Sequence, residues 1–202
     1  MDRPDFYFED LYPAPVAGVD EAGRGPWAGP VVAAAVILNR DAVPDGLNDS
    51  KKLSAKKRSA LFDVITQSAR FGIGIGSIDE IDRLNIARAN DLAMIRAVEA
   101  LGVQPAFVLI DGRSVPQQMV YPARAIIKGD GKSLSIAAAS IVAKVTRDRI
   151  MAELDEKHPG YGWARNAGYG TAEHRAALDR LGVTPHHRSS SRPIHNILYE
   201  EN

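Results

Sequence analysis

The sequence predicts a mixed α/β protein in which helices pack on the faces of a sheet. Continuous apolar runs, which suit buried strands, alternate with segments that have helical periodicity. The length of 202 residues and an apolar content of 45% suit one domain with a full core. The sequence has no cysteine, no segment typical of a signal peptide and no apolar run of membrane-spanning length, so we expect a cytoplasmic protein.

Five apolar or alternating segments are predicted to be strands. They are residues 16–20, 30–38, 71–77, 107–111 and 125–128. The third contains Gly72, Gly74 and Gly76, which alternate with isoleucine and lack the spacing of a dinucleotide-binding loop. We therefore interpret it as a glycine-rich strand.

Four helices are predicted from their periodicity and from signals at their ends. They cover about residues 54–69, 79–101, 133–157 and 171–181. Ser54 is a typical helix cap, and the third helix begins near Ser133. Gly102 and Pro159 are stop signals, because proline cannot supply the next helical hydrogen bond.

Carboxylate side chains follow three of the predicted strands at the point where each strand ends. Asp20 and Glu21 follow the first strand, Asp111 the fourth and Asp130 the last. Ligands of open α/β sheets collect at strand ends, and strand pairing can bring such carboxylates within reach of two metal ions about 4 Å apart. Oxygen ligands without cysteine favour Mg²⁺ or Mn²⁺, which bind phosphates together with carboxylates. The expected substrate is therefore a phosphodiester.

Other readings of these aspartates are weaker. An aspartate at a strand end is also a common turn former, which suits Asp111 and Asp130 with their glycine neighbours better than the Asp20-Glu21 pair. The segment 129–133 ends like a phosphate-binding P-loop, but Ile126 occupies the position of the leading glycine. No Gly-x-Ser-x-Gly elbow occurs, so neither a nucleotide triphosphatase nor a serine hydrolase is expected.

Net charge gives no argument for nucleic acid, because 25 basic residues balance 25 acidic ones. Basic residues nevertheless gather in two stretches, 51–58 and 186–192, beside serine donors that suit phosphate. A solvated helix face or tail is the common explanation for one such cluster taken alone. Three aromatic residues, Tyr161, Trp163 and Tyr169, gather among glycines, either as a stacking surface or as core packing.

Several motifs occur in a fixed order along most of the chain. They are Val19-Asp20-Glu21-Ala22-Gly23-Arg24-Gly25-Pro26, Asp49-Ser50-Lys51-Lys52-Leu53, Leu109-Ile110-Asp111-Gly112, Lys128-Gly129-Asp130, the alanine-rich segment 137–148, Pro159-Gly160-Tyr161-Gly162 and Gly168-Tyr169-Gly170-Thr171. In order and spacing they resemble the ribonuclease HII family over roughly residues 15–190. This resemblance is far more specific than any single short motif.

The resemblance implies a ribonuclease H-like mixed five-stranded sheet flanked by helices. Residues 1–160 would form the catalytic domain, and residues 161–202 a small helical C-terminal extension packed on it. It also implies an endonuclease that cuts the RNA strand of RNA–DNA hybrids and incises 5′ to ribonucleotides embedded in duplex DNA. We expect a monomer with no membrane partner. Recruitment by a sliding clamp stays open, although no clamp motif is evident at the C-terminus.

The resemblance assigns Asp20, Glu21, Asp111 and Asp130 to catalysis and to metal binding. They would hold two ions, Mn²⁺ or Mg²⁺, one activating a water and the other stabilising the leaving 3′ oxygen. The products would carry 5′-phosphate and 3′-hydroxyl ends.

Substrate contacts are implied for a second set of residues. Gly23-Arg24-Gly25 would contact the ribose 2′-hydroxyl, and Tyr169 would stack on the sugar of the following DNA nucleotide. Trp27 replaces a usually smaller residue and is expected to pack beside this site. Lys51 and Lys52 match a basic motif and are expected to contact the duplex backbone.

Three further residues are expected to contact the substrate. Lys144 lies four residues from Asp148 on a predicted helix, so it either reaches a phosphate, which we favour, or pairs with Asp148. Arg188 and Ser190 belong to the C-terminal basic stretch, where residues 189–193 lack an aromatic that the family often has.

Two functions of other classes compete with this interpretation. A non-catalytic binding module of the same fold would need a lost carboxylate, and none of the four is lost. A nuclease acting on DNA junctions would have no use for a contact to the 2′-hydroxyl. Cleavage of an all-DNA duplex would favour the second alternative, and binding of a hybrid without cleavage would favour the first.

Overall fold

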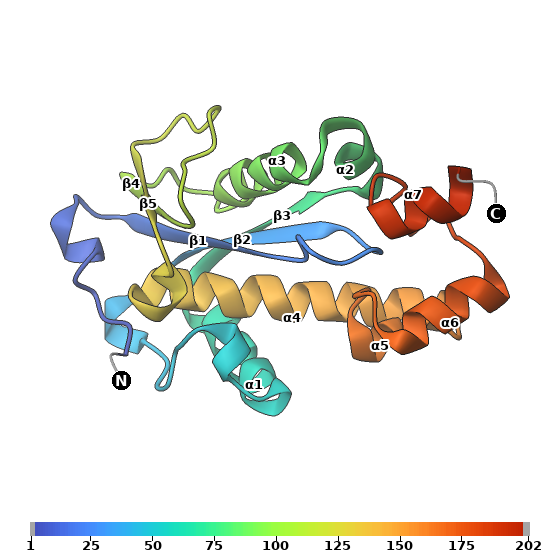
Figure 1. Cartoon of the computed structure of the whole chain (residues 1–202). Helices are drawn as coiled ribbons and strands as arrows, with labels where there is room; N and C mark the ends of the chain where they lie inside the picture. Colours follow the sequence, from blue (N-terminus) through green and yellow to red (C-terminus); the bar gives the residue numbers. More distant parts are fainter. Residues whose placement is uncertain (1–2, 200–202) are drawn as a thin grey trace.

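Residues 3–199 are described by the computed structural model, which contains a five-stranded sheet with helices on both faces (Figure 1). The strands are β1 (Val16–Ala22), β2 (Val31–Ile37), β3 (Arg70–Gly76), β4 (Phe107–Asp111) and β5 (Ala123–Ile126). Their order in the sheet is β3-β2-β1-β4-β5. β1 pairs with β2 and β2 with β3 in antiparallel fashion, whereas β1–β4 and β4–β5 are parallel. The prediction of a mixed five-stranded sheet is confirmed.

Seven α-helices and four short 3-10 helices complete the described chain. The α-helices are α1 (Ala55–Ser68), α2 (Ile78–Leu84), α3 (Ile86–Glu99), α4 (Leu134–Lys157), α5 (Trp163–Asn166), α6 (Ala172–Leu181) and α7 (Arg192–Tyr199). The 3-10 helices are η1 (Glu9–Leu11), η2 (Arg40–Ala42), η3 (Ser50–Lys52) and η4 (Gly129–Gly131). Ser54 caps α1 through its hydroxyl, as predicted, and Ser133 caps α4 in the same way.

Two predictions of element boundaries were wrong, and two helices were missed. The helix expected over residues 79–101 is two helices, because Asn85 takes a positive φ of 73° and caps α3 with its side-chain oxygen. The last strand ends at Ile126, and Lys128 has a left-handed φ of 56° that turns the chain into η4. Helices α5 and α7 were not predicted, since both are short.

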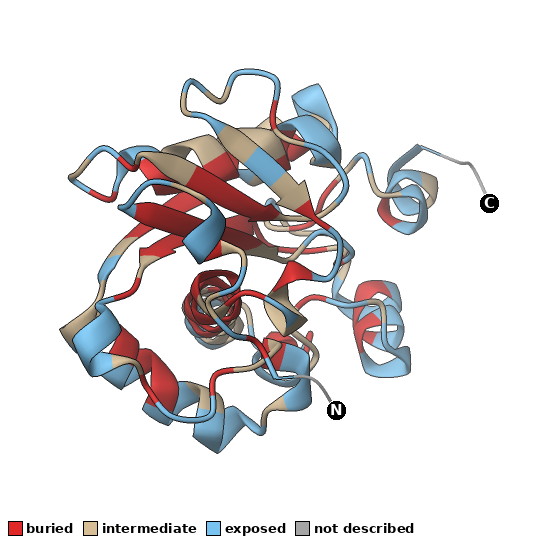
Figure 2. Ribbon diagram, turned by 90° about the vertical axis from the view of Figure 1, so that its left-hand side faces the viewer, coloured by how far each residue is buried: buried red, intermediate tan, exposed pale blue. Residues whose placement is uncertain are grey.

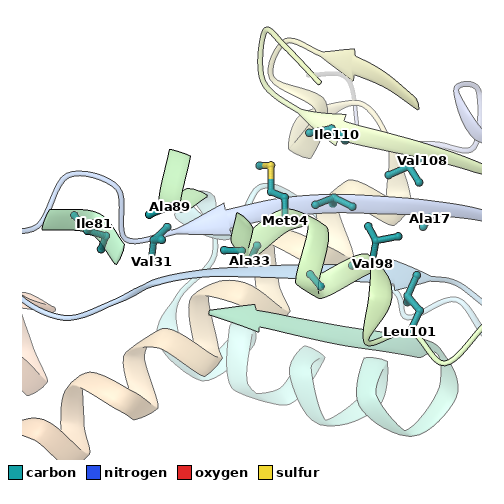
Figure 3. Packing of buried hydrophobic residues seen from close by; sticks show 14 residues of the cluster. Ala17, Val31, Ala33, Ile81, Ala89, Met94, Val98, Leu101, Val108 and Ile110 are labelled. Atoms are coloured by element: carbon teal, nitrogen blue, oxygen red, sulfur yellow. The ribbon is translucent and has the colours of Figure 1, made fainter. Parts of the chain in front are cut away.

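Helix α3 covers one face of the sheet, and α4 with α1 covers the other (Figure 1). The side chains of β2 alternate between the two faces, so Ala33 packs under α3 and Ala34 under α4. Figure 2 shows that the central strands and much of α4 are buried, and Figure 3 shows the cluster beneath α3. A Cβ on Gly74 would overlap the carbonyl oxygen of Ala93, so the glycines of β3 let α3 pack directly against the sheet. The interpretation of this segment as a glycine-rich strand is confirmed.

The chain after Gly160 forms α5, α6 and α7, which lie near the C-terminal end of α4 (Figure 1). They share a small core with Met151 of α4 and Ala28. Tyr161 and Trp163 are buried in this core, which supports core packing for these two aromatics. The division of the chain at residue 160 stays a prediction. Among the described helices, none combines the length and apolarity needed to cross a membrane.

Candidate active site

Three aspartates from three elements meet at one end of the parallel strands. Asp20 lies in β1, Asp111 ends β4 and Asp130 lies in η4. One carboxylate oxygen from each lies within 4.8 Å of the other two. The predicted convergence of these three residues is therefore present, although they are separated by up to 110 positions in sequence.

Strand pairing and one hydrogen bond explain this convergence. The parallel register of β1 and β4 pairs Val19 with Ile110, so Asp20 and Asp111 come next on neighbouring strands. The backbone N–H of Gly129 donates to Oδ1 of Asp111 at 2.6 Å, which draws η4 toward the end of β4. Oδ1 of Asp20 accepts from the N–H of Glu21 at 2.7 Å. The side chains are thus fixed by backbone contacts rather than by cationic partners.

Glu21 lies beside this trio but outside it. Its Oε1 accepts from Nη1 of Arg24 at 3.3 Å, and Arg24 remains more than half exposed. Its Oε2 is buried and has no hydrogen-bond partner among the described residues. An unpartnered buried carboxylate oxygen is costly, so this atom is suited to bind a further ligand at the edge of the site.

The electrostatics of the site reflect crowded negative charge. Burial, followed by repulsion from Glu21 and Asp111, raises the pKa of Asp20 well above its usual value. Burial and Asp111 also raise the pKa of Asp130, to about 6. Lys51 faces the same group: burial opposes its charge, but Asp20, Asp49 and Asp130 outweigh that effect and raise its pKa. Burial and crowded negative charge thus favour an additional cation beside Asp20 and Asp130.

A divalent metal ion fits this arrangement. Asp20 is only 6% exposed, and none of the three aspartates forms an ion pair within residues 3–199. All of the available donors are carboxylate oxygens, which suit Mg²⁺ and Mn²⁺. Asp20, Asp111 and Asp130 would hold the ions, with Glu21 beside them.

The basic loop of η3 adjoins the aspartates. Ser140 of α4 accepts a hydrogen bond of 3.2 Å from the N–H of Ser50, and Arg58 donates to the carbonyl of Ser50 at 3.0 Å. These contacts hold Lys51 and Lys52 at the site. A Cβ on Gly131 would lie 3.7 Å from Nζ of Lys52, so the Lys52 ammonium also approaches η4.

The Gly23-Arg24-Gly25 turn leads directly out of β1, and Tyr169 lies against it. A Cβ on Gly25 would lie 3.4 Å from Cε1 of Tyr169, whose side chain is half exposed. Gly23 has a φ of 99°, and a Cβ there would overlap Nε of Arg147. Trp27 packs on Gly170, next to Tyr169, so the expected packing of Trp27 beside this turn is confirmed.

The remaining predicted contact residues are engaged with protein groups. Nζ of Lys144 lies 2.6 Å from Oδ1 of Asp148, which is the pairing that the sequence left open. Arg188 is 2% exposed and donates to backbone carbonyls. The hydroxyl and the N–H of Ser190 donate to Oδ1 of Asp82 in α2. Arg188 and Ser190 thus hold the C-terminal segment against the rest of the fold in this structure.

A buried histidine pair, which sequence reasoning missed, supports the turn that carries Tyr169. Nε2 of His174 accepts from Nε1–H of Trp163 at 3.2 Å, so its Nδ1–H donates to the Tyr169 carbonyl at 3.0 Å. Nδ1 of His187 accepts from the N–H of Thr184 at 2.9 Å, so its Nε2–H donates to Nε2 of His174 at 3.0 Å. Both imidazoles are therefore neutral. Burial, followed by the neighbouring His174, lowers the pKa of His187 to about 4.

Fold and site together define a metal-dependent nuclease, with a carboxylate cluster at the ends of parallel strands and a basic loop beside it. A family model for ribonuclease HII matches residues 17–196. Ribonuclease HII from Ruegeria pomeroyi is 58% identical over 205 aligned residues, which cover all of this chain and 88% of that protein. The chain belongs to the ribonuclease HII family.

Solved structures agree with this assignment. Ribonuclease H2 from Pyrococcus horikoshii OT3 has a TM-score of 0.76 at 26% identity, covering 90% of this chain and 96% of that one. A chain in the structure of the PCNA:RNase HII complex from Archaeoglobus fulgidus has a TM-score of 0.75 at 28% identity, covering 87% and 94%. The protein is accordingly a ribonuclease H of a family of endonucleases that degrade the RNA of RNA–DNA hybrids with Mn²⁺ or Mg²⁺.

Proposed function

We propose that this protein, besides cutting the RNA strand of hybrids, incises duplex DNA on the 5′ side of a single embedded ribonucleotide. One observation carries the proposal: Tyr169 lies against the Gly23-Arg24-Gly25 turn, and that turn continues the strand that holds Asp20 and Glu21. A group that recognises a ribose hydroxyl is thereby joined to the carboxylate cluster by a few residues of backbone. Such coupling suits an enzyme that tests one sugar at the bond it cuts.

The reaction we propose is hydrolysis of the bond between the phosphorus and the 3′ oxygen of the preceding nucleotide. Water supplies the oxygen that stays on the phosphorus, and the 3′ oxygen leaves and takes up a proton. The products carry a 5′-phosphate on the ribonucleotide and a 3′-hydroxyl on the upstream strand. When bound, the divalent ions supply an activated water and stabilise the charge on the leaving oxygen.

The protein's own residues have distinct parts in this proposal. Asp20, Asp111 and Asp130 hold the ions, and Glu21 contributes from the edge of the cluster. Lys51 neutralises phosphate charge beside the aspartates, which its raised pKa supports because the ammonium stays protonated at neutral pH. Lys52 and Lys144 are further candidates for contacts to the duplex backbone. Lys144 would then give up its ion pair with Asp148 and bind a phosphate.

The 2′-hydroxyl reader consists of the turn and Tyr169. Backbone groups of Gly23 and Gly25 can approach a sugar because no side chain intervenes. The exposed ring of Tyr169 offers a surface for the sugar of the following DNA nucleotide. We also propose that the protein works as a cytoplasmic monomer, in which the turn between α5 and α6 contributes Tyr169 to a catalytic domain formed by residues 1–160.

The test is cleavage of three end-labelled duplexes of one sequence: an RNA–DNA hybrid, a DNA duplex with one ribonucleotide, and an all-DNA duplex. We expect cuts in the first two with Mg²⁺ or Mn²⁺, a single cut 5′ to the lone ribonucleotide, and ends that a ligase requiring 5′-phosphate and 3′-hydroxyl can rejoin. A cut in the all-DNA duplex would instead indicate a junction nuclease. Binding of the hybrid without any cut in either metal would indicate a binding module.

A further inference from the structure

Two arginine side chains are buried beneath the Gly23-Arg24-Gly25 turn without a carboxylate partner. Arg147 is 1% exposed and Arg188 is 2% exposed. Neither forms an ion pair with any residue among positions 3–199. Burying an unpaired charge is expensive, so these guanidiniums must be satisfied by other groups, and the proposed activity alone does not account for them.

Backbone carbonyls of the segment 23–30 satisfy both guanidiniums. Arg188 donates to Gly23 at 2.6 Å, Gly29 at 2.8 Å, Arg24 at 3.0 Å and Pro30 at 3.2 Å. Arg147 donates to Pro30 and Ala167 at 2.9 Å and to Ala28 at 3.1 Å. Arg147 thus joins the segment that leaves β1 to the turn that precedes Tyr169.

These bonds fix the direction of two N–H groups. In a trans peptide the C=O and the following N–H point in opposite directions. Because the carbonyls of Gly23 and Arg24 point at Arg188, the N–H groups of Arg24 and Gly25 point away from it. Within the described chain, neither N–H donates to another protein group. Two free donors of the turn therefore point away from Arg188.

The charge of the arginines also strengthens these donors. A cation bound to the oxygen of a peptide polarises the same peptide and makes its N–H a better donor. Burial lowers the pKa of Arg188 to about 9 and that of Arg147 to about 10, so both stay protonated at neutral pH. A lysine in either place would keep the charge but lose the fork of N–H groups that holds several carbonyls at once.

We propose that Arg147 and Arg188 are positioning residues that set the preference for a ribonucleotide, by aiming the N–H groups of Arg24 and Gly25 at the 2′-hydroxyl. The inference rests on the proposed function of the turn. Neither arginine touches the substrate. Arg188 orients the two peptides, and Arg147 keeps the Tyr169 turn in register with them.

The experiment compares binding of two duplexes that differ by one 2′-hydroxyl. Dissociation constants are measured for a DNA duplex with one ribonucleotide and for the all-DNA duplex, in Ca²⁺. Ca²⁺ binds carboxylate oxygens at longer distances than Mg²⁺ and does not reproduce the tight geometry that Mg²⁺ requires. Binding can therefore be measured without cleavage of the duplex. The proteins are the wild type, Arg147→Lys, Arg188→Lys and the matched control Arg96→Lys. Arg96 also donates to a backbone carbonyl, that of Ile75 at 2.7 Å, but in β3 at the sheet edge.

We expect the wild type to prefer the ribonucleotide duplex and Arg96→Lys to keep that preference. In Arg147→Lys and Arg188→Lys the preference should fall by about fivefold or more, as for one lost hydrogen bond, while affinity for the all-DNA duplex is unchanged. A purely structural role would lower the melting temperature and leave the preference intact, and that result overturns the inference. A wild type without any preference would instead overturn the proposed reader itself.

A measurement on the wild type covers the case in which a lysine variant does not fold. Amide NMR signals of Arg24 and Gly25 should shift when the ribonucleotide duplex is added in Ca²⁺, and shift less with the all-DNA duplex. Equal shifts with both duplexes would contradict the inference.

Discussion

The backbone N–H of Gly129 donates a hydrogen bond of 2.6 Å to Oδ1 of Asp111, so one carboxylate of the active site holds the turn that carries another. Asp111 thereby has two functions, because it contributes an oxygen to the carboxylate cluster and also positions the turn that carries Asp130. A substitution of Asp111 that keeps the hydrogen-bond acceptor but removes the charge separates these two functions.

Asp111→Asn should fold normally and lose activity. The asparagine oxygen can still accept from Gly129, but the lost charge weakens metal binding, and a loss of several kcal/mol in transition-state stabilisation reduces the rate by roughly 1,000-fold. Without metal the variant should be more stable than the wild type, because burial and repulsion from Glu21 and Asp111 raise the pKa of Asp20, and the substitution removes one of these charges. Thermal unfolding with and without Mn²⁺ measures this. A variant less stable than the wild type in chelator would contradict the account of crowded charge.

Gly23→Ala should damage both stability and ribonucleotide preference. Its φ of 99° strains any side chain, and the added Cβ would overlap Arg147, so we expect a loss of about 1–3 kcal/mol in the free energy of unfolding by urea. The matched control is Gly102→Ala, which also has a positive φ, 69°, but meets no atom within 4 Å. The control should lose about 1 kcal/mol and cleave normally. Equal cleavage by both variants would count against the turn as a reader.

Lys144→Ala and Asp148→Ala test whether the pair on α4 serves stability or binding. Both side chains are about a third exposed, so their coupling in a double-mutant cycle of unfolding should be below about 0.5 kcal/mol. If Lys144 contacts a phosphate, Lys144→Ala lowers the slope of log affinity against log salt by about one. Asp148→Ala should bind the duplex more tightly, because the lysine is then free. An unchanged salt slope in Lys144→Ala would mean that Lys144 does not contact a phosphate and that the pair is only a surface ion pair of α4.

The neutral histidine pair predicts a pH dependence of stability. The pKa of His187 is lowered to about 4 in the folded protein, below its usual 6.5, so the unfolded chain binds the proton more readily. The contribution of His187 is complete above about pH 6.5 and is lost as the pH falls toward 4, by about 1.4 kcal/mol per unit within that window. The raised pKa values of Asp20 and Asp130 act in the opposite direction, so the wild-type curve alone is ambiguous.

The informative quantity is the difference in unfolding free energy between the wild type and His187→Gln, since the aspartates are common to both. This difference should be largest at pH 7 and should shrink as the pH falls to 5. A difference that is constant over this range would mean that His187 is not held neutral by the fold.

The sequence was most informative where local pattern and tertiary structure agree. The segment 107–111 is a continuous apolar run that ends in a polar residue, and β4 has those bounds. Asn85 does not interrupt the apolar periodicity, so residues 79–101 were predicted as one helix. The positive φ of Asn85 nevertheless separates α2 from α3. The approach of Asp20, Asp111 and Asp130 could be expected because strand ends of a parallel sheet share an edge.

The supports of the site were hidden for a physical reason. Arg147 and Arg188 are charged residues, for which exposure is the ordinary expectation, and their burial depends mainly on carbonyls more than 100 positions away. No local pattern encodes which distant carbonyl will accept a hydrogen bond.

The most direct test of the whole account is single-turnover cleavage of a labelled DNA duplex with one ribonucleotide, titrated with Mg²⁺ and with Mn²⁺. Wild type and Asp111→Asn are compared, with chelator as the blank. We predict incision 5′ to the ribonucleotide that requires the metal in the wild type and is reduced by roughly 1,000-fold in the variant. Metal-independent cleavage, or equal rates for the two proteins, would contradict a carboxylate site that works through bound divalent ions.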